Sequence, residues 1–403
     1  MYLLAFAITA AVLLIVALPA TAGVLPQPVE QIVYRCSSGS GHDLCMIGPD
    51  GDGFVQLTDD GTGDVEPEIS PTGREIAWRH DVTEIWVMDT EGGNQRHVTV
   101  DYNAAFTNPS WSPGGDRLVM GCNDPDNLTT DGLCFINANG GGFEFYPLDD
   151  LNVGGVKWSP DGKNVLFTAE TVSVNEDLFV LDLDTGNYEN ITQTGTKYEH
   201  GTWSPDGSKI AFVGSPPDDE VNDTNNLSDL FVINPDGTGR EFLFEPMWGA
   251  NATNPAWSPD GSKIAFFCAH SEIGADEMCI VDANDGDLID VVSAPGDGYL
   301  FAIAAEPDWG VVGGVQQGDV DCSLAVNSVD ALKLLRHVAG LSVLQTEPCP
   351  DVSTDVASLW GDVDCSGAAN SVDALKVLRY VAALSVAQTE PCLDVGVVVL
   401  LPN

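Results

Sequence analysis

The sequence predicts an all-β propeller of six blades, followed by a small α-helical domain built from a duplicated loop-and-helix unit. Three observations lead to this prediction. A motif of the type Trp-Ser-Pro-Asp-Gly recurs through most of the chain. The segment before the first motif and a truncated motif after the last one complete each other. Near the C-terminus a different repeat begins, which has a period of 43 residues and is rich in oxygen-bearing side chains.

The chain begins with an apolar run, MYLLAFAITAAVLLIVALPATAGV, whose last part contains Ala20-Thr21-Ala22. This pattern is typical of a secretory signal peptide, residues 1–22, that is cleaved before Gly23. An uncleaved membrane anchor is the alternative, because no Lys or Arg precedes the apolar run. No later stretch has the length and apolarity of a membrane span, so we expect no membrane insertion after cleavage. The prediction is a secreted or extracellular protein, free or held at the cell surface.

The composition is strongly acidic. Among 403 residues there are 61 acidic and 15 basic ones, which gives a formal net charge of -46. Such a surface repels phosphate backbones and anionic lipids, so we expect no nucleic-acid partner. Hydrophobic residues make up 44% of the chain, enough for a buried core and more than one domain.

The first repeat predicts the blades. The motif prolines are Pro71, Pro113, Pro160, Pro205 and Pro259, and they are spaced by 42, 47, 45 and 54 residues, the period of a four-stranded propeller blade. In each copy Pro presets φ and Gly accepts a positive φ, so the motif forms a tight turn between strands. The repeated letters therefore describe turns and core faces rather than an active site.

The two ends of this repeat predict how the ring closes. Residues 31–58 contain the later strands of a blade without a motif before them, and Glu306–Gly310 (EPDWG) supply a first strand. Pairing these segments leaves no exposed sheet edge. The Trp-Ser-Pro-Asp-Gly repeats resemble those of TolB-like β-propellers over residues 27–312. The resemblance implies a six-bladed fold and says little about function.

Ten cysteines in a chain that carries an export signal predict disulfides. When the blades are aligned, one position holds a cysteine in three blades, and so does a second position on the neighbouring strand. The predicted bridges are Cys36–Cys45, Cys122–Cys134 and Cys268–Cys279. A redox or metal role is the alternative, although the spacings match no zinc motif.

Five polar residues and one glycine stand where the inner strands of the blades enter the central channel. They stand three positions before the motif tryptophan or its equivalent, and they are Glu66, Asn108, Gly155, His200, Asn254 and Glu306. A polar ring of this kind can hold a cation, a sugar or a peptide end. The alternative is that these side chains only bond neighbouring blades to one another.

The second repeat predicts two calcium sites. Each copy has oxygen side chains at positions 1, 3, 5, 9 and 12 of a twelve-residue loop, and a backbone carbonyl at position 7. Ca²⁺ requires six to eight oxygen ligands, which such a loop can supply. The candidate ligands are Asp319, Asp321, Ser323, Ala325, Asn327 and Asp330 in the first copy, and Asp362, Asp364, Ser366, Ala368, Asn370 and Asp373 in the second. An amphipathic helix is expected after each loop.

Residues 316–394 resemble the duplicated calcium-loop-helix of type I dockerins, with 395–403 as a tail. The resemblance implies docking to a cohesin-like partner in a bacterial host, through Ser328, Val329, Lys333, Arg336, Ser371, Val372, Lys376 and Arg379. Position 6 of the loop needs a left-handed residue, which Gly367 provides and Leu324 does not, so the first site should be the weaker one. Equal spacing favours bridges Cys322–Cys349 and Cys365–Cys392, but cross-repeat pairing stays open. A helical pair that no longer binds metal is the alternative.

Together these patterns predict a secreted, non-catalytic binding protein. Its propeller would recognise a protein or a carbohydrate, and its calcium-dependent domain would attach it to a cohesin-like partner. The alternative is a carbohydrate-active enzyme, a polysaccharide lyase or hydrolase, with its site in the propeller channel. The six histidines show no Ser-His-Asp order, and no residue is assigned a catalytic role.

Overall fold

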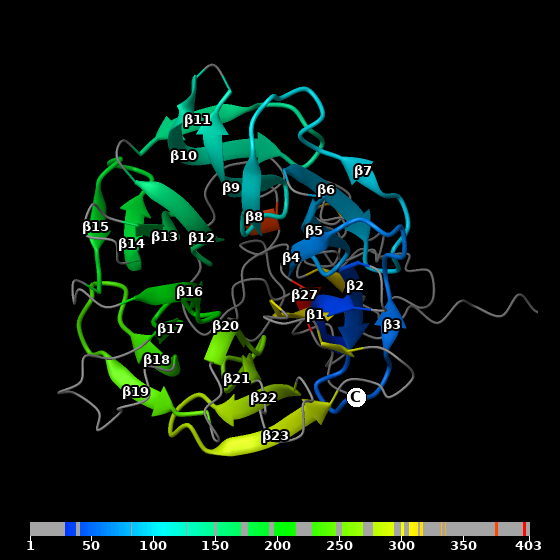
Figure 1. The fold of residues 1–403 in the computed structure, drawn as a ribbon, viewed down its shortest axis with the longest axis vertical. Coiled ribbons are helices and arrows are strands. Elements are labelled where there is room, and N and C mark those ends of the chain that lie inside the picture. Colours follow the sequence, from blue (N-terminus) through cyan, green and yellow to red (C-terminus); the bar gives the residue numbers. More distant parts are fainter. Residues whose placement is uncertain are drawn as a thin grey trace, which may run out of the picture.

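The computed structural model shows a six-bladed β-propeller (Figure 1). It describes residues 29–37, 41–81, 83–125, 127–148, 151–170, 176–192, 197–214, 228–246, 252–268, 277–293, 300–301, 306–312, 315–316, 332, 335, 375–377 and 398–399. The predicted signal peptide, residues 1–22, lies outside these ranges. Within them, no helix has the length and apolarity needed to cross a membrane.

Five blades are four-stranded antiparallel sheets whose strands follow the order of the chain, from the channel outward. The inner strands are β4 (Asp64–Ile69), β8 (Phe106–Trp111), β12 (Asn152–Trp158), β16 (Tyr198–Trp203) and β20 (Ala252–Trp257). The second strands are β5 (Glu75–His80), β9 (Arg117–Asp124), β13 (Asn164–Glu170), β17 (Ile210–Gly214) and β21 (Lys263–Cys268). The third strands are β6 (Glu84–Asp89), β10 (Asn127–Asn137), β14 (Glu176–Asp182), β18 (Asp229–Ile233) and β22 (Glu277–Asp282). The outer strands are β7 (Arg96–His97), β11 (Glu144–Pro147), β15 (Tyr188–Asn190), β19 (Glu241–Phe244) and β23 (Leu288–Ser293).

The remaining blade joins the two ends of the propeller. Its later strands are β1 (Val29–Ser37), β2 (Asp43–Ile47) and β3 (Val55–Gln56). Its inner strand is β25 (Asp308–Val312), which pairs antiparallel with β1 so that Asp308 lies opposite Val33. The short strand β24 (Leu300–Phe301) pairs with the end of β1. The ring closure predicted from the truncated motif is confirmed.

The motif serves as a turn between the first two strands of a blade. In the copy at Ser258, the Ser hydroxyl donates to Asp260 Oδ1 at 2.7 Å and accepts from Lys263 N at 2.9 Å. Gly261 has φ 71°, a conformation that L-residues avoid. The Ser hydroxyl, the Asp carboxylate and the Gly of the motif thus all stabilise the turn, as expected of a structural motif.

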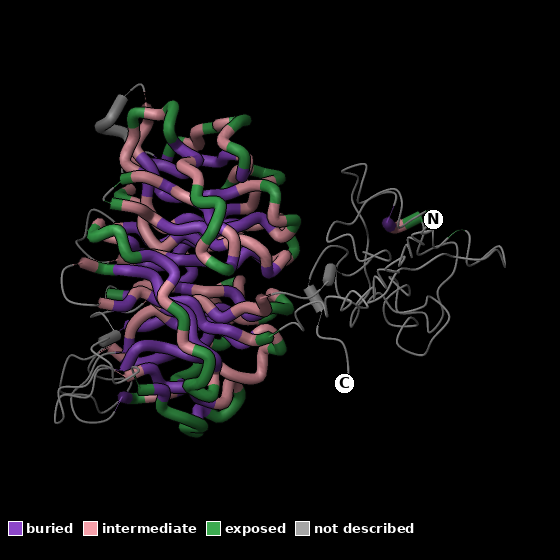
Figure 2. The backbone as a smooth tube through the Cα atoms, turned by 90° about the vertical axis from the view of Figure 1, so that its right-hand side faces the viewer, coloured by how far each residue is buried: buried purple, intermediate pink, exposed green. Residues whose placement is uncertain are grey.

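Three of the motif tryptophans, Trp111, Trp203 and Trp257, join neighbouring blades. Trp111 Nε1 donates to the carbonyl of Glu68 at 3.1 Å, and Trp257 Nε1 donates to the carbonyl of Thr202 at 3.3 Å. In both pairs the acceptor lies on the inner strand of the preceding blade. Each interface between neighbouring blades also has its own cluster of buried apolar side chains. Figure 2 shows the buried segments inside the propeller and the exposed ones mainly at its turns and edges.

The three predicted propeller disulfides are present. Cys36–Cys45, Cys122–Cys134 and Cys268–Cys279 each join the second and third strands of their blade, with Cα atoms 5.8 to 5.9 Å apart. Each bridge constrains a short loop of the unfolded chain and so contributes about 2–3 kcal/mol in the chain-entropy view.

Beyond the propeller, the structure describes a strand pair that the sequence analysis did not predict. Strand β26 (Val315–Gln316) pairs antiparallel with β27 (Val398–Val399), which brings the two ends of the C-terminal region together. Leu332, Leu335 and residues 375–377 are helical. All twelve predicted calcium ligands, the cysteines from Cys322 onward, and the predicted docking residues except Lys376 lie outside the described residues.

Candidate functional site in the central channel

The six polar-ring positions line one cavity on the propeller axis. It has a volume of about 470 Å³, counting the part that is open to solvent. The ring residues share a left-handed backbone conformation, with φ between 47° and 55°. They are Glu66, Asn108, Gly155, His200, Asn254 and Glu306. In five blades the register of the inner strand shifts at this point, so each ring residue sits in a β-bulge that turns it toward the axis.

One half of the ring is built from two carboxylates held by arginines. Arg79 forms a two-point ion pair with Glu66, with Nε to Oε2 at 2.8 Å and Nη2 to Oε1 at 2.6 Å. Arg35 Nη1 lies 3.3 Å from Glu306 Oε1. All four side chains are at most 21% exposed, so solvent screens these pairs only partly. Burial raises the pKa of Glu306 to about 7, and the neighbouring Glu66 adds to the effect while Arg35 opposes it.

Ring side chains in this half also bond the backbone of the next blade. Glu306 Oε2 accepts from Glu66 N at 2.7 Å, Glu66 Oε2 accepts from Asn108 N at 2.6 Å, and Asn108 Oδ1 accepts from Gly155 N at 3.1 Å. Four blades are linked in this way, one after another. The alternative interpretation of the ring, that its members bond neighbouring blades, therefore holds for Glu306, Glu66 and Asn108.

The other half of the ring has polar atoms without partners. Gly155 has no side chain, and a Cβ there would lie 2.6 Å from Thr168 Oγ1. Among the described residues, His200 Nδ1 and Asn254 Nδ2 are buried and have no hydrogen-bond partner. Burial lowers the pKa of His200, so the imidazole is neutral near pH 7 and has one donor and one acceptor nitrogen. An unpaired buried polar group is costly, and both of these residues line the channel cavity.

A second layer of charge lies two residues beyond the ring. Glu68 forms an ion pair with Lys157, and its Oε1 accepts from Ser110 Oγ and Trp111 N at 2.9 Å each. Asp308 Oδ2 accepts from Ile69 N at 2.8 Å. Burial acts to lower the pKa of Lys157, but the carboxylates of Glu68 and Asp308 outweigh it and raise that pKa. Burial raises the pKa of Asp308 to about 6, against the attraction of Lys157.

Sequence reasoning found the ring but missed the basic residues that pair with it. Arg35 and Arg79 stand at equivalent positions on the second strands of two blades, each two residues beyond the residue that pairs with Asp308 or Glu68, so the blade alignment carried a signal for them. Lys157 had a usable signal, because it stands at the same offset from the ring as Glu68 and Asp308. Three of only 15 basic residues lie at this channel, so the local charge is far closer to neutral than that of the whole chain.

Comparison with known proteins agrees with this architecture. A family model described as the TolB β-propeller domain matches residues 28–229, half of the chain. The chain belongs to this family. The TolB propeller is also similar in fold to the crystal structure of TolB from Acinetobacter baumannii, with a TM-score of 0.55 and 18% identity, covering 69% of this chain and 66% of that one. The structure of a putative TolB from Agrobacterium tumefaciens gives a TM-score of 0.53 at 16% identity and covers 71% of this chain and 98% of that one.

A curated relative is similar to only part of this chain. It is a dipeptidyl-peptidase 5 of Porphyromonas gingivalis, which is 30% identical over 132 residues, or 30% of this chain. The match spans 19% of the length of that peptidase. The comparison therefore shows similarity over a part of each chain and carries no activity over to this chain.

Proposed function

We propose that the protein is a non-catalytic binding protein whose TolB propeller takes a ligand at the His200–Asn254 half of the channel ring. The observation that carries this proposal is the pair of buried, unpartnered atoms, His200 Nδ1 and Asn254 Nδ2. Both belong to residues that line the cavity. The amide needs an acceptor and the neutral imidazole takes a donor or an acceptor, so hydroxyl, carboxylate and amide groups all fit.

Two ligand classes present such groups, a polysaccharide and an end or loop of a protein. The arrangement of charge fits binding better than catalysis, because the nearby carboxylates of Glu66 and Glu306 are held by Arg79 and Arg35. A general acid or base must reach the proton that it transfers, and these carboxylates are committed to structural contacts. The enzymatic alternative therefore depends on His200 alone.

A binding and turnover assay tests the proposal. The full chain is titrated with soluble plant polysaccharides, pectin included, and with protein fractions of the source organism's secretome, and product formation is followed in parallel. We expect binding without turnover, and a loss of binding in Asn254→Gly and His200→Asn, which keep residue types that accept this backbone conformation. Turnover that His200→Asn abolishes would establish the enzymatic alternative instead.

We further propose that residues 316–394 form a calcium-dependent docking domain that attaches the secreted chain to a cohesin-like partner. Two copies of the same twelve-residue oxygen pattern support this proposal. The pairing of β26 with β27 adds support, because it joins the two ends of this region as in a self-contained unit. The helical residues 375–377 begin two positions after Asp373, the last oxygen position of the second loop, where the loop-and-helix unit requires a helix.

Calcium titration of the full chain tests the docking domain. We expect two Ca²⁺ equivalents, with the first loop weaker because Leu324 stands where a left-handed turn is needed. Asp362→Ala should remove the tighter site and Asp319→Ala the weaker one. Asp355→Ala, which removes the same charge outside both loops, serves as the control. Recombinant type I cohesin modules should bind in calcium and release in chelator. If the chain binds no calcium, the docking-domain proposal is wrong, whereas the channel proposal is unaffected.

A further inference from the structure

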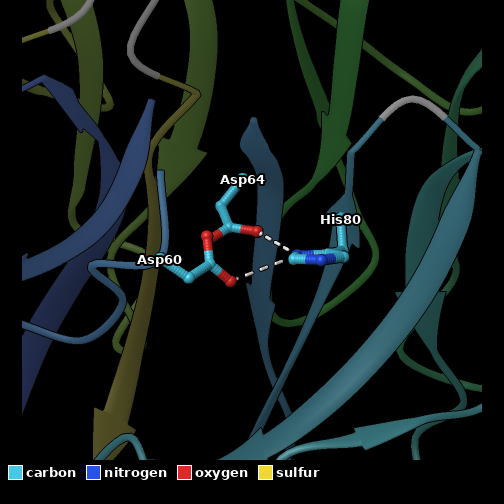
Figure 3. A group of neighbouring side chains, drawn as sticks. All are labelled: Asp60, Asp64 and His80. Atoms are coloured by element: carbon cyan, nitrogen blue, oxygen red, sulfur yellow. Dashed lines mark hydrogen bonds and ion pairs between the residues drawn. The ribbon is translucent and has the colours of Figure 1, made fainter. Parts of the chain in front are cut away.

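Three ligand-bearing side chains of the second blade meet on one face of the propeller. They are Asp60 in the β3–β4 connection, Asp64 at the start of β4 and His80 at the end of β5. Their potential ligand atoms all lie within 4.8 Å of one another. Figure 3 shows the two carboxylates next to each other, with the imidazole facing both.

Asp60 has one oxygen held by Thr62 and the other near His80, whereas Asp64 uses a single oxygen for its contacts with both Trp78 and His80. Asp60 Oδ1 accepts from Thr62 N at 2.9 Å and from Thr62 Oγ1 at 2.5 Å, while Asp60 Oδ2 lies 3.9 Å from His80 Nδ1. Asp64 Oδ1 accepts from Trp78 Nε1 at 2.8 Å and lies 2.7 Å from His80 Nδ1.

The second oxygen of Asp64 is the independent sign of a missing ligand. Asp64 is fully buried, and within the described part of the chain its Oδ2 has no hydrogen-bond partner. A buried carboxylate oxygen without a donor costs free energy, and a bound cation removes that cost. The imidazole is held in place by the Trp86 ring at 4.8 Å, which in turn stacks on His97 at 5.4 Å.

We propose that Asp60, Asp64 and His80 form a divalent transition-metal site, with Zn²⁺ as the best-fitting ion. One imidazole and two carboxylates suit Zn²⁺ better than Ca²⁺, which prefers six or more oxygens. In a tetrahedral zinc site neighbouring ligand atoms are about 3.3 Å apart, so Asp60 Oδ2 has to approach His80 by less than about 1 Å. Asp60 is 46% exposed on a surface connection and can make this movement. Trp78 Nε1 then orients Asp64 as an outer partner of the metal.

The position of this site in the blade indicates its use. His80 pairs with Asp64 in the same register in which Cys122 pairs with Phe106 and Cys268 with Ala252. Those cysteines form the disulfides of their blades, whereas this blade has no cysteine. A metal bound here ties the connection between two blades to β4 and β5. It supplies the crosslink that this blade otherwise lacks, independently of the proposed calcium loops and channel ligand.

Zinc titration of the full chain, without a histidine tag and with Ca²⁺ saturating any calcium loops, tests the site. We expect one Zn²⁺ equivalent and a rise in melting temperature in the parent chain. Asp60→Asn should weaken zinc binding more than about ten-fold, because it removes a direct ligand. The matched control is Asp59→Asn, which removes the same charge one residue away and should change nothing.

A second probe assigns the imidazole. Co²⁺ in place of Zn²⁺ should give visible d–d absorption in the parent chain and in Asp59→Asn, and the band should be lost in His80→Gln. Equal zinc affinity in Asp59→Asn and Asp60→Asn overturns the proposal, because binding would then reflect the acidic surface as a whole. A parent chain that binds no zinc overturns it as well.

Discussion

The two halves of the channel ring have the same backbone and different chemistry. Glu66 and His200 both sit in bulges with φ near 50°. Glu66 is bound by Arg79 and by the backbone of the next blade, whereas His200 Nδ1 has no partner among the described residues. Six equivalent positions of one fold can thus have two roles. Some bond neighbouring blades together, and others leave polar atoms without a protein partner. The repeat provides the geometry, and the side chain that occupies each position decides its use.

Breaking the paired half should have the largest effect on stability. Glu66→Ala removes both contacts to Arg79 and leaves that guanidinium largely buried without its main partner, which should cost about 3 kcal/mol of unfolding free energy. Urea unfolding measures this cost. The control is Glu75→Ala, whose pair with Arg96 is 30% to 38% exposed and should be worth at most about 1 kcal/mol. Equal losses in the two variants would contradict the distinction between the ring pair and a surface pair.

The pH dependence of the unfolding free energy should also depend on the paired half of the ring, through Glu306. Because burial raises the pKa of Glu306 from 4.5 to about 7, the folded chain binds more protons than the unfolded chain between these values. The contribution of Glu306 to stability is therefore fully present below about pH 4.5 and is lost as the pH rises through 7. Asp308, whose pKa is raised to about 6, acts in the same direction.

Glu306→Gln should reduce the fall of unfolding free energy with rising pH. The part of the fall that is due to Asp308 should remain. Urea unfolding between pH 5 and pH 8 measures the slope in both chains. An unchanged slope in Glu306→Gln would mean that the carboxyl group titrates near its ordinary pKa and that Arg35 fully compensates its burial.

The unpaired half should show the smallest effect on stability. Asn254→Gly removes a buried amide nitrogen that has no partner among the described residues, and it keeps a residue that accepts φ near 51°. We expect the unfolding free energy to change by less than about 0.5 kcal/mol. Thermal and urea unfolding in the absence of ligand measure it. A loss of 2 kcal/mol or more would show that this half is structural as well and would remove the contrast.

Much of the propeller fold could be predicted from the sequence, because the blades repeat. Glu306–Gly310 could be assigned to the first blade before any coordinates, since it is a motif without a blade and residues 31–58 are a blade without a motif. The cysteine pairs followed from the same alignment, because equivalent residues of a repeat lie at equivalent places. The ring positions followed from strand periodicity and closure.

The partners of these positions follow from the repeat only in part. Arg79 and Arg35 stand at equivalent positions, and each reaches the ring glutamate on the inner strand of its own blade. The same position holds no arginine in the other four blades. Asp60, Asp64 and His80 meet through a loop whose path no motif describes. These three side chains come together because of their directions and because of the path of the connection between two blades. Neither of these features repeats from blade to blade.

The sequence by itself determined the number of blades, the closure of the ring, the three propeller bridges and the residues that face the channel. These are consequences of local turn chemistry and of repetition, which act the same way in every copy. Only the tertiary structure decided which ring residues are paired and which have buried atoms left over, and that one blade gathers two carboxylates and an imidazole. Those outcomes depend on distances between residues far apart in the chain, and such distances are set by packing around the closed ring.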